Sequence, residues 1–105
     1  MLELRNGKAI IIGSVNTGHF IVLFKNGTKF KMIKSVKAHN SKYINCIIEL
    51  NNHRIASAGN ATVKLWSPNF KLTNSYLFKD QIYDLQQISD ENLICRTKTL
   101  CFIFN

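Results

Sequence analysis

The sequence predicts an all-β protein, and three observations carry this prediction. Short apolar runs alternate with turn residues along the chain, and no amphipathic helical stripe interrupts them. The turns are rich in Asn, Gly and Asp, which tolerate the positive backbone angles of tight hairpins. The pattern of runs also recurs with a spacing near 40 residues. Repetition on this scale indicates a fold assembled from similar small sheets.

Five turn sequences separate groups of expected strands along the chain. The turns are Asn6-Gly7, Asn26-Gly27, Asn51-Asn52, Ser67-Pro68-Asn69 and residues 89–92. Counting from Met1, the end of one strand precedes the first of these turns. Ten further strands are expected at residues 8–14, 20–25, 29–36, 44–50, 54–58, 62–67, 72–78, 81–88, 92–97 and 100–104. We expect almost no helix.

Composition indicates a single small globular domain. The 105 residues match a common domain size, and 46% hydrophobic residues with one proline disfavour a disordered or fibrous chain. No apolar run approaches the roughly 20 residues of a membrane-spanning helix, and no signal-peptide core is visible. We expect a protein without membrane association, located inside the cell, in the cytoplasm.

The three cysteines are expected to be small core residues. Cys46, Cys95 and Cys101 form an odd set without a Cys-x-x-Cys pair, and each lies in an apolar stretch typical of a strand. Disulfide partners and metal ligands are the less favoured alternatives.

An internal repeat is visible in the second half of the chain. Residues 49–57 match residues 87–95, and residues 62–66 match residues 100–104, both at a shift of 38. One offset therefore fits both stretches without a gap.

The first half repeats the same pattern more loosely. Residues 20–24 align with residues 62–66 at a shift of 42, and residues 3–10 align with residues 49–56 at a shift of 46. The difference of four predicts a longer connection around residues 15–19.

The middle repeat resembles a known family. Thr62-Val63-Lys64-Leu65-Trp66, preceded by residues 55–60 and by Ala38-His39, resembles the core of a WD repeat, the four-stranded unit of a β-propeller blade. The flanking repeats carry Phe24 and Phe104 where this alignment places the tryptophan. The resemblance implies a partial β-propeller of about three antiparallel blades with incomplete ends, at residues 1–37, 38–78 and 79–105.

The resemblance also implies a buried polar relay within the blade. By position its members are His39, Ser57 and Trp66, with Asn60 where the family has an aspartate. A buried indole N–H needs an acceptor, which Ser57 can provide. We favour a structural role for His39 over a catalytic or ligand role, because no cluster of Cys, His or Asp lies near it in the sequence.

Partners of this family often contact the upper rim of the propeller. The resemblance maps that rim to Asn16, Thr17, His19, Lys37, Asn40, Lys42, Tyr43, Lys79 and Lys98. The net charge of +8 favours acidic partners, nucleic acid or anionic surfaces. Six of the lysines gather in one region: Lys25, Lys29, Lys31, Lys34, Lys37 and Lys42. A solvated face protecting an edge strand is the simpler interpretation of these lysines, and a binding patch is the alternative.

Catalysis finds little support in the sequence. The chain lacks phosphate-binding glycine motifs, zinc-ligand spacing and a nucleophile elbow, and Asp80, Asp84, Asp90 and Glu91 are scattered. We expect no enzyme activity, no cofactor and no metal site.

Two hypotheses follow for function. The first is a non-catalytic protein–protein interaction or scaffold module of the WD-repeat type within a larger assembly. The second is a basic RNA-binding component of a ribonucleoprotein. Three blades are fewer than the four to eight of closed propellers. The chain is therefore expected to be a fragment of a longer propeller, to form a homodimer, or to complete the propeller of another protein.

Overall fold

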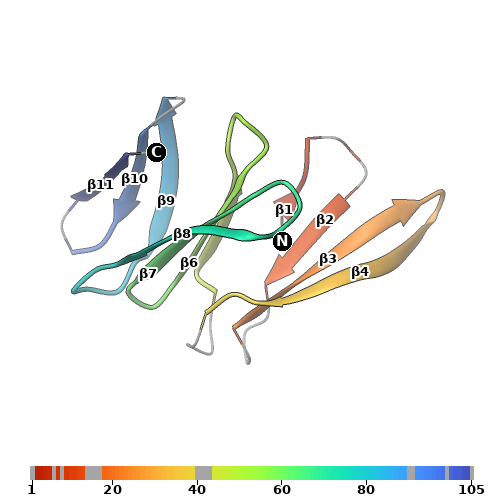
Figure 1. Ribbon diagram of the computed structural model, residues 1–105, viewed down its shortest axis with the longest axis horizontal. Coiled ribbons are helices and arrows are strands. Elements are labelled where there is room, and N and C mark those ends of the chain that lie inside the picture. The colour runs from red at the N-terminus through yellow and green to blue at the C-terminus, as the bar shows by residue number, and fades with distance from the viewer. Residues whose placement is uncertain are drawn as a thin grey trace.

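A computed structural model describes residues 2–5, 7, 9–13, 18–39, 44–89, 92–98 and 100–104, with the backbone alone for residues 10, 12, 26 and 100–104 (Figure 1). These residues form antiparallel sheets and no helix. The all-β prediction is confirmed.

Three sheets follow one another along the chain. The first sheet contains β1 (Leu2–Glu3), β2 (Ala9–Gly13), β3 (His19–Asn26) and β4 (Lys29–Lys37). The middle sheet contains β5 (Cys46–Glu49), β6 (Ile55–Gly59), β7 (Thr62–Trp66) and β8 (Leu72–Leu77). The third sheet contains β9 (Asp84–Ser89), β10 (Asn92–Arg96) and β11 (Leu100–Phe104). Within each sheet, strands that follow one another in sequence pair with one another in antiparallel fashion.

Each of the expected strands overlaps an observed one, and the largest difference is at the start of β9. The sequence predicts this strand from residue 81, whereas β9 begins at Asp84. The main-chain N–H of Ile82 instead donates to the Asn60 carbonyl at 2.7 Å, and its own carbonyl accepts from Asn45 Nδ2 at 2.8 Å. Ile82 therefore binds the middle sheet rather than extending β9.

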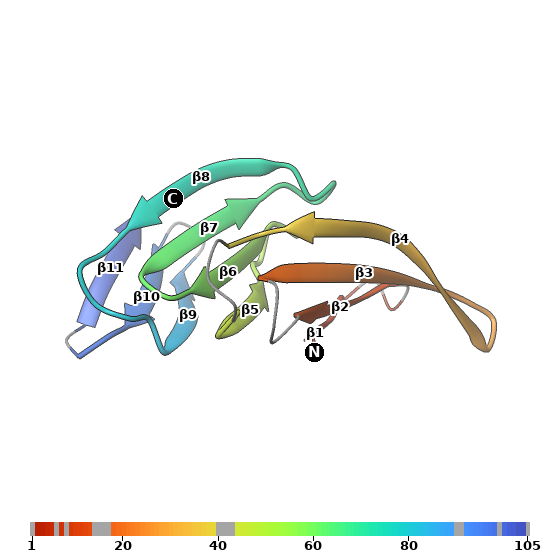
Figure 2. The same ribbon diagram turned by 90° about the horizontal axis from the view of Figure 1, so that it is seen from below.

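The sheets lie side by side with their first strands adjacent (Figures 1 and 2). β1 contacts β5, and β5 contacts β9. The strands β4 and β8 lie at the opposite edges of their sheets, and Figure 2 shows them together on one side. The arrangement places a face of the middle sheet against each neighbour.

Two apolar clusters fill the two spaces between sheets. Phe20, Ile55 and Trp66 belong to the cluster between the first and middle sheets. Val63 and Leu65 belong to the cluster that the middle sheet shares with the third. All five residues of β6 are buried, because this strand contacts both clusters.

The hydrogen-bond register corrects the alignment of Trp66 with Phe24. Trp66 pairs with Ile55, which pairs with Glu49. In the first sheet, Glu3 pairs with Ile10 and Ile10 with Leu23, so Leu23 occupies the position of Trp66. Phe24 is one residue further on and therefore lies on the opposite face.

The same correction applies to the third sheet. Gln87 pairs with Leu93 and Leu93 with Ile103, so Ile103, rather than Phe104, stands at the register position of Trp66. Leu93 and Ile103 are ten residues apart along the chain (103 − 93), whereas Ile55 and Trp66 are eleven apart (66 − 55). The ungapped alignment is therefore one residue out of register in β11.

Candidate functional site

The structure brings three of the four predicted relay residues together. Ser57 Oγ lies 2.9 Å from His39 Nε2, and Trp66 Nε1 donates to the same Oγ at 2.9 Å. All three side chains are buried. Ser57 lies on β6, Trp66 on β7 and His39 on the segment that follows β4. The contacts therefore join the segment that leaves the first sheet to the middle sheet.

Backbone pairing explains why these side chains meet. Ser57 pairs with Lys64, two residues before Trp66, which places Ser57 and Trp66 on the same face of the sheet. The main-chain N–H of His39 donates to the Gly18 carbonyl at 3.0 Å, which fixes the imidazole above that face. Phe20 packs edge-on against Trp66 with ring centroids 5.2 Å apart.

The Trp66 indole N–H can only donate, so Ser57 Oγ accepts from it. The imidazole tautomer sets the direction of the hydrogen bond between Ser57 Oγ and His39 Nε2, because the hydroxyl can both donate and accept. His39 Nδ1 is buried, and the described part of the chain provides no hydrogen-bond partner for it. Burial first, and the charge of Lys64 second, lower the pKa of His39 to about 4, so the imidazole is neutral at pH 7.

The fourth predicted member, Asn60, is not joined to this relay. Asn60 lies in the β6–β7 turn with φ of 53°, and its side chain is exposed. Its carbonyl accepts the Ile82 N–H, so its backbone contributes to the packing of the third sheet. Asparagine tolerates this left-handed conformation, which gives the residue a turn-forming role.

A cavity of about 320 Å³ lies beside the relay. Its lining is mostly polar and consists of His39, Gly59, Asn60, Thr62, Lys64, Ser75 and Leu77. Ser57 does not line it and has an exposed fraction of 0%. A serine next to a histidine is a nucleophile only where substrate reaches it. The geometry therefore fits a relay that fixes strands rather than a catalytic pair.

Four of the predicted rim residues lie within the described residues. His19 pairs with Lys37 across the ends of β3 and β4, Lys79 follows β8, and Lys98 lies between β10 and β11. The three lysines are exposed and His19 is half-buried. The other predicted rim residues, Asn16, Thr17, Asn40, Lys42 and Tyr43, lie outside the described part.

Main-chain hydrogen bonds hold three of the connections between strands close together. The Phe78 N–H donates to the Ala61 carbonyl at 2.8 Å, and the Tyr83 N–H donates to the Arg96 carbonyl at 2.7 Å. The β6–β7 turn, the β8–β9 segment and the β10–β11 turn thus lie together, on the left side of Figure 1.

The hairpin of β3 and β4 forms a second exposed surface, which we call the basic hairpin. It carries Lys25, Lys29, Lys31, Lys34 and Lys37, and no Asp or Glu occurs in the sequence between Glu3 and Glu49. All its lysines are exposed, and Lys34 Nζ donates to the Asn69 carbonyl at 3.2 Å. Lys29 and Lys31 share one face, as the period-two spacing predicts.

The same hairpin exposes apolar side chains, which the sequence reasoning missed. Phe30 has an exposed fraction of 50%, Met32 of 59% and Ile33 of 53%. The signal that could have identified these exposed side chains is their alternation with lysines, because a strand whose two faces carry lysine is rarely buried.

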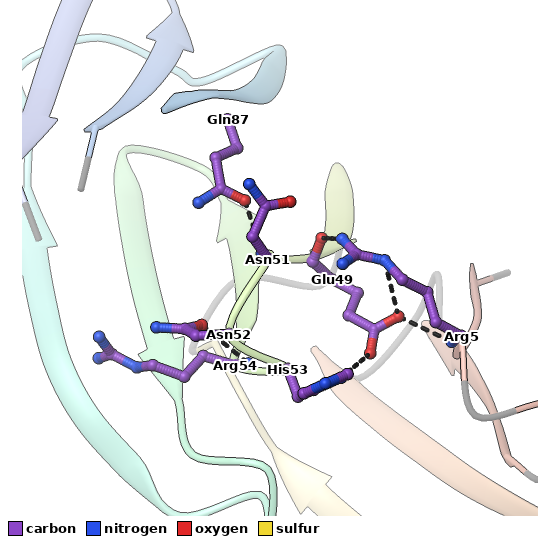
Figure 3. A network of polar contacts seen from close by, with 7 residues as sticks. All are labelled: Arg5, Glu49, Asn51, Asn52, His53, Arg54 and Gln87. Atoms are coloured by element: carbon purple, nitrogen blue, oxygen red, sulfur yellow. Dashed lines mark hydrogen bonds and ion pairs between the residues drawn. The ribbon is translucent and has the colours of Figure 1, made fainter. Parts of the chain in front are cut away.

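A polar network surrounds the turn between β5 and β6 (Figure 3). Glu49 accepts the Arg5 main-chain N–H at 2.8 Å, and its carboxylate also lies 3.6 Å from Arg5 Nε and 3.4 Å from His53 Nδ1. Asn51 donates its main-chain N–H to Gln87 Oε1 at 2.7 Å. These contacts join all three sheets.

Other reactive groups are isolated in the described residues. Cys46 Sγ lies 3.7 Å from Asp84 Oδ1, and burial raises the pKa of this thiol, which keeps it protonated. Across the described part of the chain, no three His, Cys, Asp or Glu side chains converge as metal ligands would. The same residues contain no helix with the length and apolarity needed to cross a membrane.

Comparison with protein-family models and with curated proteins found no match to this sequence.

Proposed function

We propose that this chain is a non-catalytic protein–protein interaction or scaffold module, built as part of a WD-repeat β-propeller and acting in a larger assembly. The observation that carries the proposal is the arrangement of three antiparallel sheets in the same strand order with adjacent first strands. A propeller consists of such sheets around a common axis. The contacts of His39, Ser57 and Trp66 further support a blade-like middle sheet.

The basic hairpin is the surface that we propose for partner contact. Its lysines provide a local positive field, and the exposed Phe30 and Met32 lie among them. Apolar side chains supply contact energy at interfaces, and surrounding charges steer complementary partners. A partner with an acidic surface therefore fits best.

Charge reversal tests this proposal with a matched pair of variants. Lys29→Glu with Lys31→Glu changes the hairpin, and Lys79→Glu with Lys98→Glu makes the same change of net charge at the rim. With a polyglutamate chain as probe, we expect the hairpin pair to raise the Kd about tenfold and the rim pair to raise it less. Equal weakening by both pairs, or a lowered Tm in the hairpin pair alone, would contradict hairpin binding.

RNA is the alternative partner, and a specific observation favours it. Phe24 and Phe30 are partly exposed, at 39% and 50%, on strands that also carry lysines. Exposed aromatic rings beside basic residues are typical of single-strand binding. An RNA oligonucleotide titrated at two salt concentrations tests this, because phosphate contacts give an affinity that falls steeply with salt. Absence of binding at low salt excludes the alternative.

The proposal includes a cytoplasmic location. The odd number of cysteines without a Cys-x-x-Cys pair supports it, because disulfide frameworks are typical of secreted domains. Imaging of a fluorescent fusion tests this part, and a signal confined to a secretory compartment would contradict it.

A further inference from the structure

The cavity beside the relay lies over one face of the middle sheet. Its lining includes Thr62 and Lys64 from β7, and Ser75 and Leu77 from β8. Thr62 pairs with Leu77, and Lys64 pairs with Ser75. Alternate residues of a strand point to the same face, and so do residues paired across two strands, which places these four side chains in two adjacent rows. The structure therefore brings one ammonium group and two hydroxyl groups together on one face.

The polar relay occupies the same face. Ser57 pairs with Lys64 across β6 and β7, so the Ser57 hydroxyl lies on the face that carries the Lys64 side chain. His39 lies against Ser57, lines the cavity and has an exposed fraction of 2%. Its Nδ1 has no hydrogen-bond partner in the described part of the chain. Buried polar atoms are almost always paired, so an imidazole with an unpaired nitrogen in the lining indicates a ligand site.

The charged residue of the lining is Lys64. Its side chain is half-buried, and no Asp or Glu belongs to the lining. Among the described residues Lys64 has no ion-pair partner, since the ion pairs found there join Glu49 to Arg5 and His53. A half-buried ammonium group acts through a lower effective dielectric constant than water provides. An anion in this cavity is therefore attracted more strongly than it would be at an exposed lysine.

The charge and size of the cavity select a class of ligand. One ammonium group balances one negative charge, so a monovalent carboxylate fits better than a phosphate, whose further charge would lack a partner. The hydroxyls of Thr62 and Ser75 can donate to carboxylate oxygens. The volume of about 320 Å³ is at the lower end of the range for small-molecule sites. Leu77, with an exposed fraction of 82%, offers apolar surface to a short hydrocarbon chain.

We propose that this cavity binds a small carboxylate with a short hydrocarbon chain. Lys64 Nζ and the hydroxyls of Thr62 and Ser75 donate to the carboxylate, and Leu77 contacts the chain. The site lies on the middle sheet, whereas the basic hairpin belongs to the first sheet. Binding here therefore adds a small-molecule ligand and does not require the proposed interaction function.

NMR titration of the isotope-labelled chain with butyrate, at constant ionic strength, tests the proposal. We expect saturable shifts in the amide signals of β7 and β8. Lys64→Gln should raise the Kd about tenfold, which is the effect of losing one charge-assisted hydrogen bond. Lys64→Arg keeps the charge and should retain most of the affinity. Lys29→Gln is the matched control, because it removes the same charge from the basic hairpin, outside the lining, and should leave the Kd unchanged.

Two further probes test the ligand class on the wild-type chain, independently of any variant. Butylammonium has the same hydrocarbon chain with the opposite charge, and phosphate is an oxyanion without a chain. Both should bind more weakly than butyrate. Equal binding of either probe would overturn the proposal, as would an unchanged Kd in Lys64→Gln or an equal loss in Lys29→Gln.

Polyglutamate distinguishes a free small molecule from an acidic side chain of a protein. It presents carboxylates on a polypeptide and should leave butyrate bound, because its expected contact is with the basic hairpin. Displacement of butyrate by polyglutamate would assign the cavity to a partner's side chain and would overturn the small-molecule site. Retention of butyrate in the presence of polyglutamate would support it.

Discussion

The middle sheet and the first sheet have the same strand order but opposite relations to solvent. The middle sheet packs both faces against neighbours, and every residue of β6 is buried. The first sheet packs one face, and β4 is exposed over nearly its whole length. The difference shows that sheets of the same strand order can differ in how much of their surface is buried. The middle sheet contributes both faces to the core, and the first sheet leaves the side chains of β4 exposed to solvent.

The largest expected effect on stability comes from a substitution in the packed middle sheet. Leu65→Ala should lower the free energy of unfolding by about 2–5 kcal/mol, because the side chain is fully buried and its removal leaves a cavity. Urea denaturation followed by circular dichroism measures this change.

Met32→Ala is the matched control on the half-packed side. With an exposed fraction of 59%, Met32 should change the free energy of unfolding by less than about 0.5 kcal/mol. A Met32 cost near that of Leu65 would show that this exposed side chain is covered by a contact in solution.

The next effect concerns the polar relay inside the packed sheet. Trp66→Phe keeps the ring packed against Phe20 but removes the indole donor to Ser57, and should cost about 1–3 kcal/mol. Ser57→Ala should cost a similar amount. In a double-mutant cycle, the combined variant should cost less than the sum of the two single variants. Strict additivity would show that the hydrogen bond contributes nothing to stability.

A smaller effect depends on pH. The pKa of His39 is lowered from 6.5 to about 4 in the folded chain. Between these two pH values, His39 is protonated in the unfolded chain and neutral in the folded chain. The contribution of this residue is therefore fully present above pH 6.5 and is lost as the pH falls toward 4, by up to about 1.4 kcal/mol per pH unit. Urea titrations across this window measure the slope. His39→Gln should flatten it, and an unchanged slope in that variant would assign the loss to other groups.

The sequence predicted the positions of the strands well. It predicted less well which side chains of different sheets occupy equivalent positions. Turn residues such as Asn26-Gly27 locate hairpins because their conformations are local. The counterpart of Trp66 could not be located in this way, because one additional residue in a hairpin shifts a strand to its other face. The relay positions of Ser57 and Trp66 followed from a family resemblance, whereas the contact of Asn51 with Gln87 depends on packing between sheets and has no local signal.

The smallest expected effect on stability belongs to the basic hairpin. Lys29→Gln with Lys31→Gln should change the Tm by no more than a degree or two, because both side chains are exposed and surface substitutions rarely exceed about 0.5 kcal/mol. A small rise in Tm is expected at low salt, since the substitutions relieve repulsion among lysines that lack acidic neighbours in this stretch. The rise should vanish at high salt, where screening removes the repulsion. Thermal unfolding at two ionic strengths measures both. A salt-independent loss of several degrees would mean that these lysines stabilise the sheet, and would place the first sheet with the middle one as a structural element.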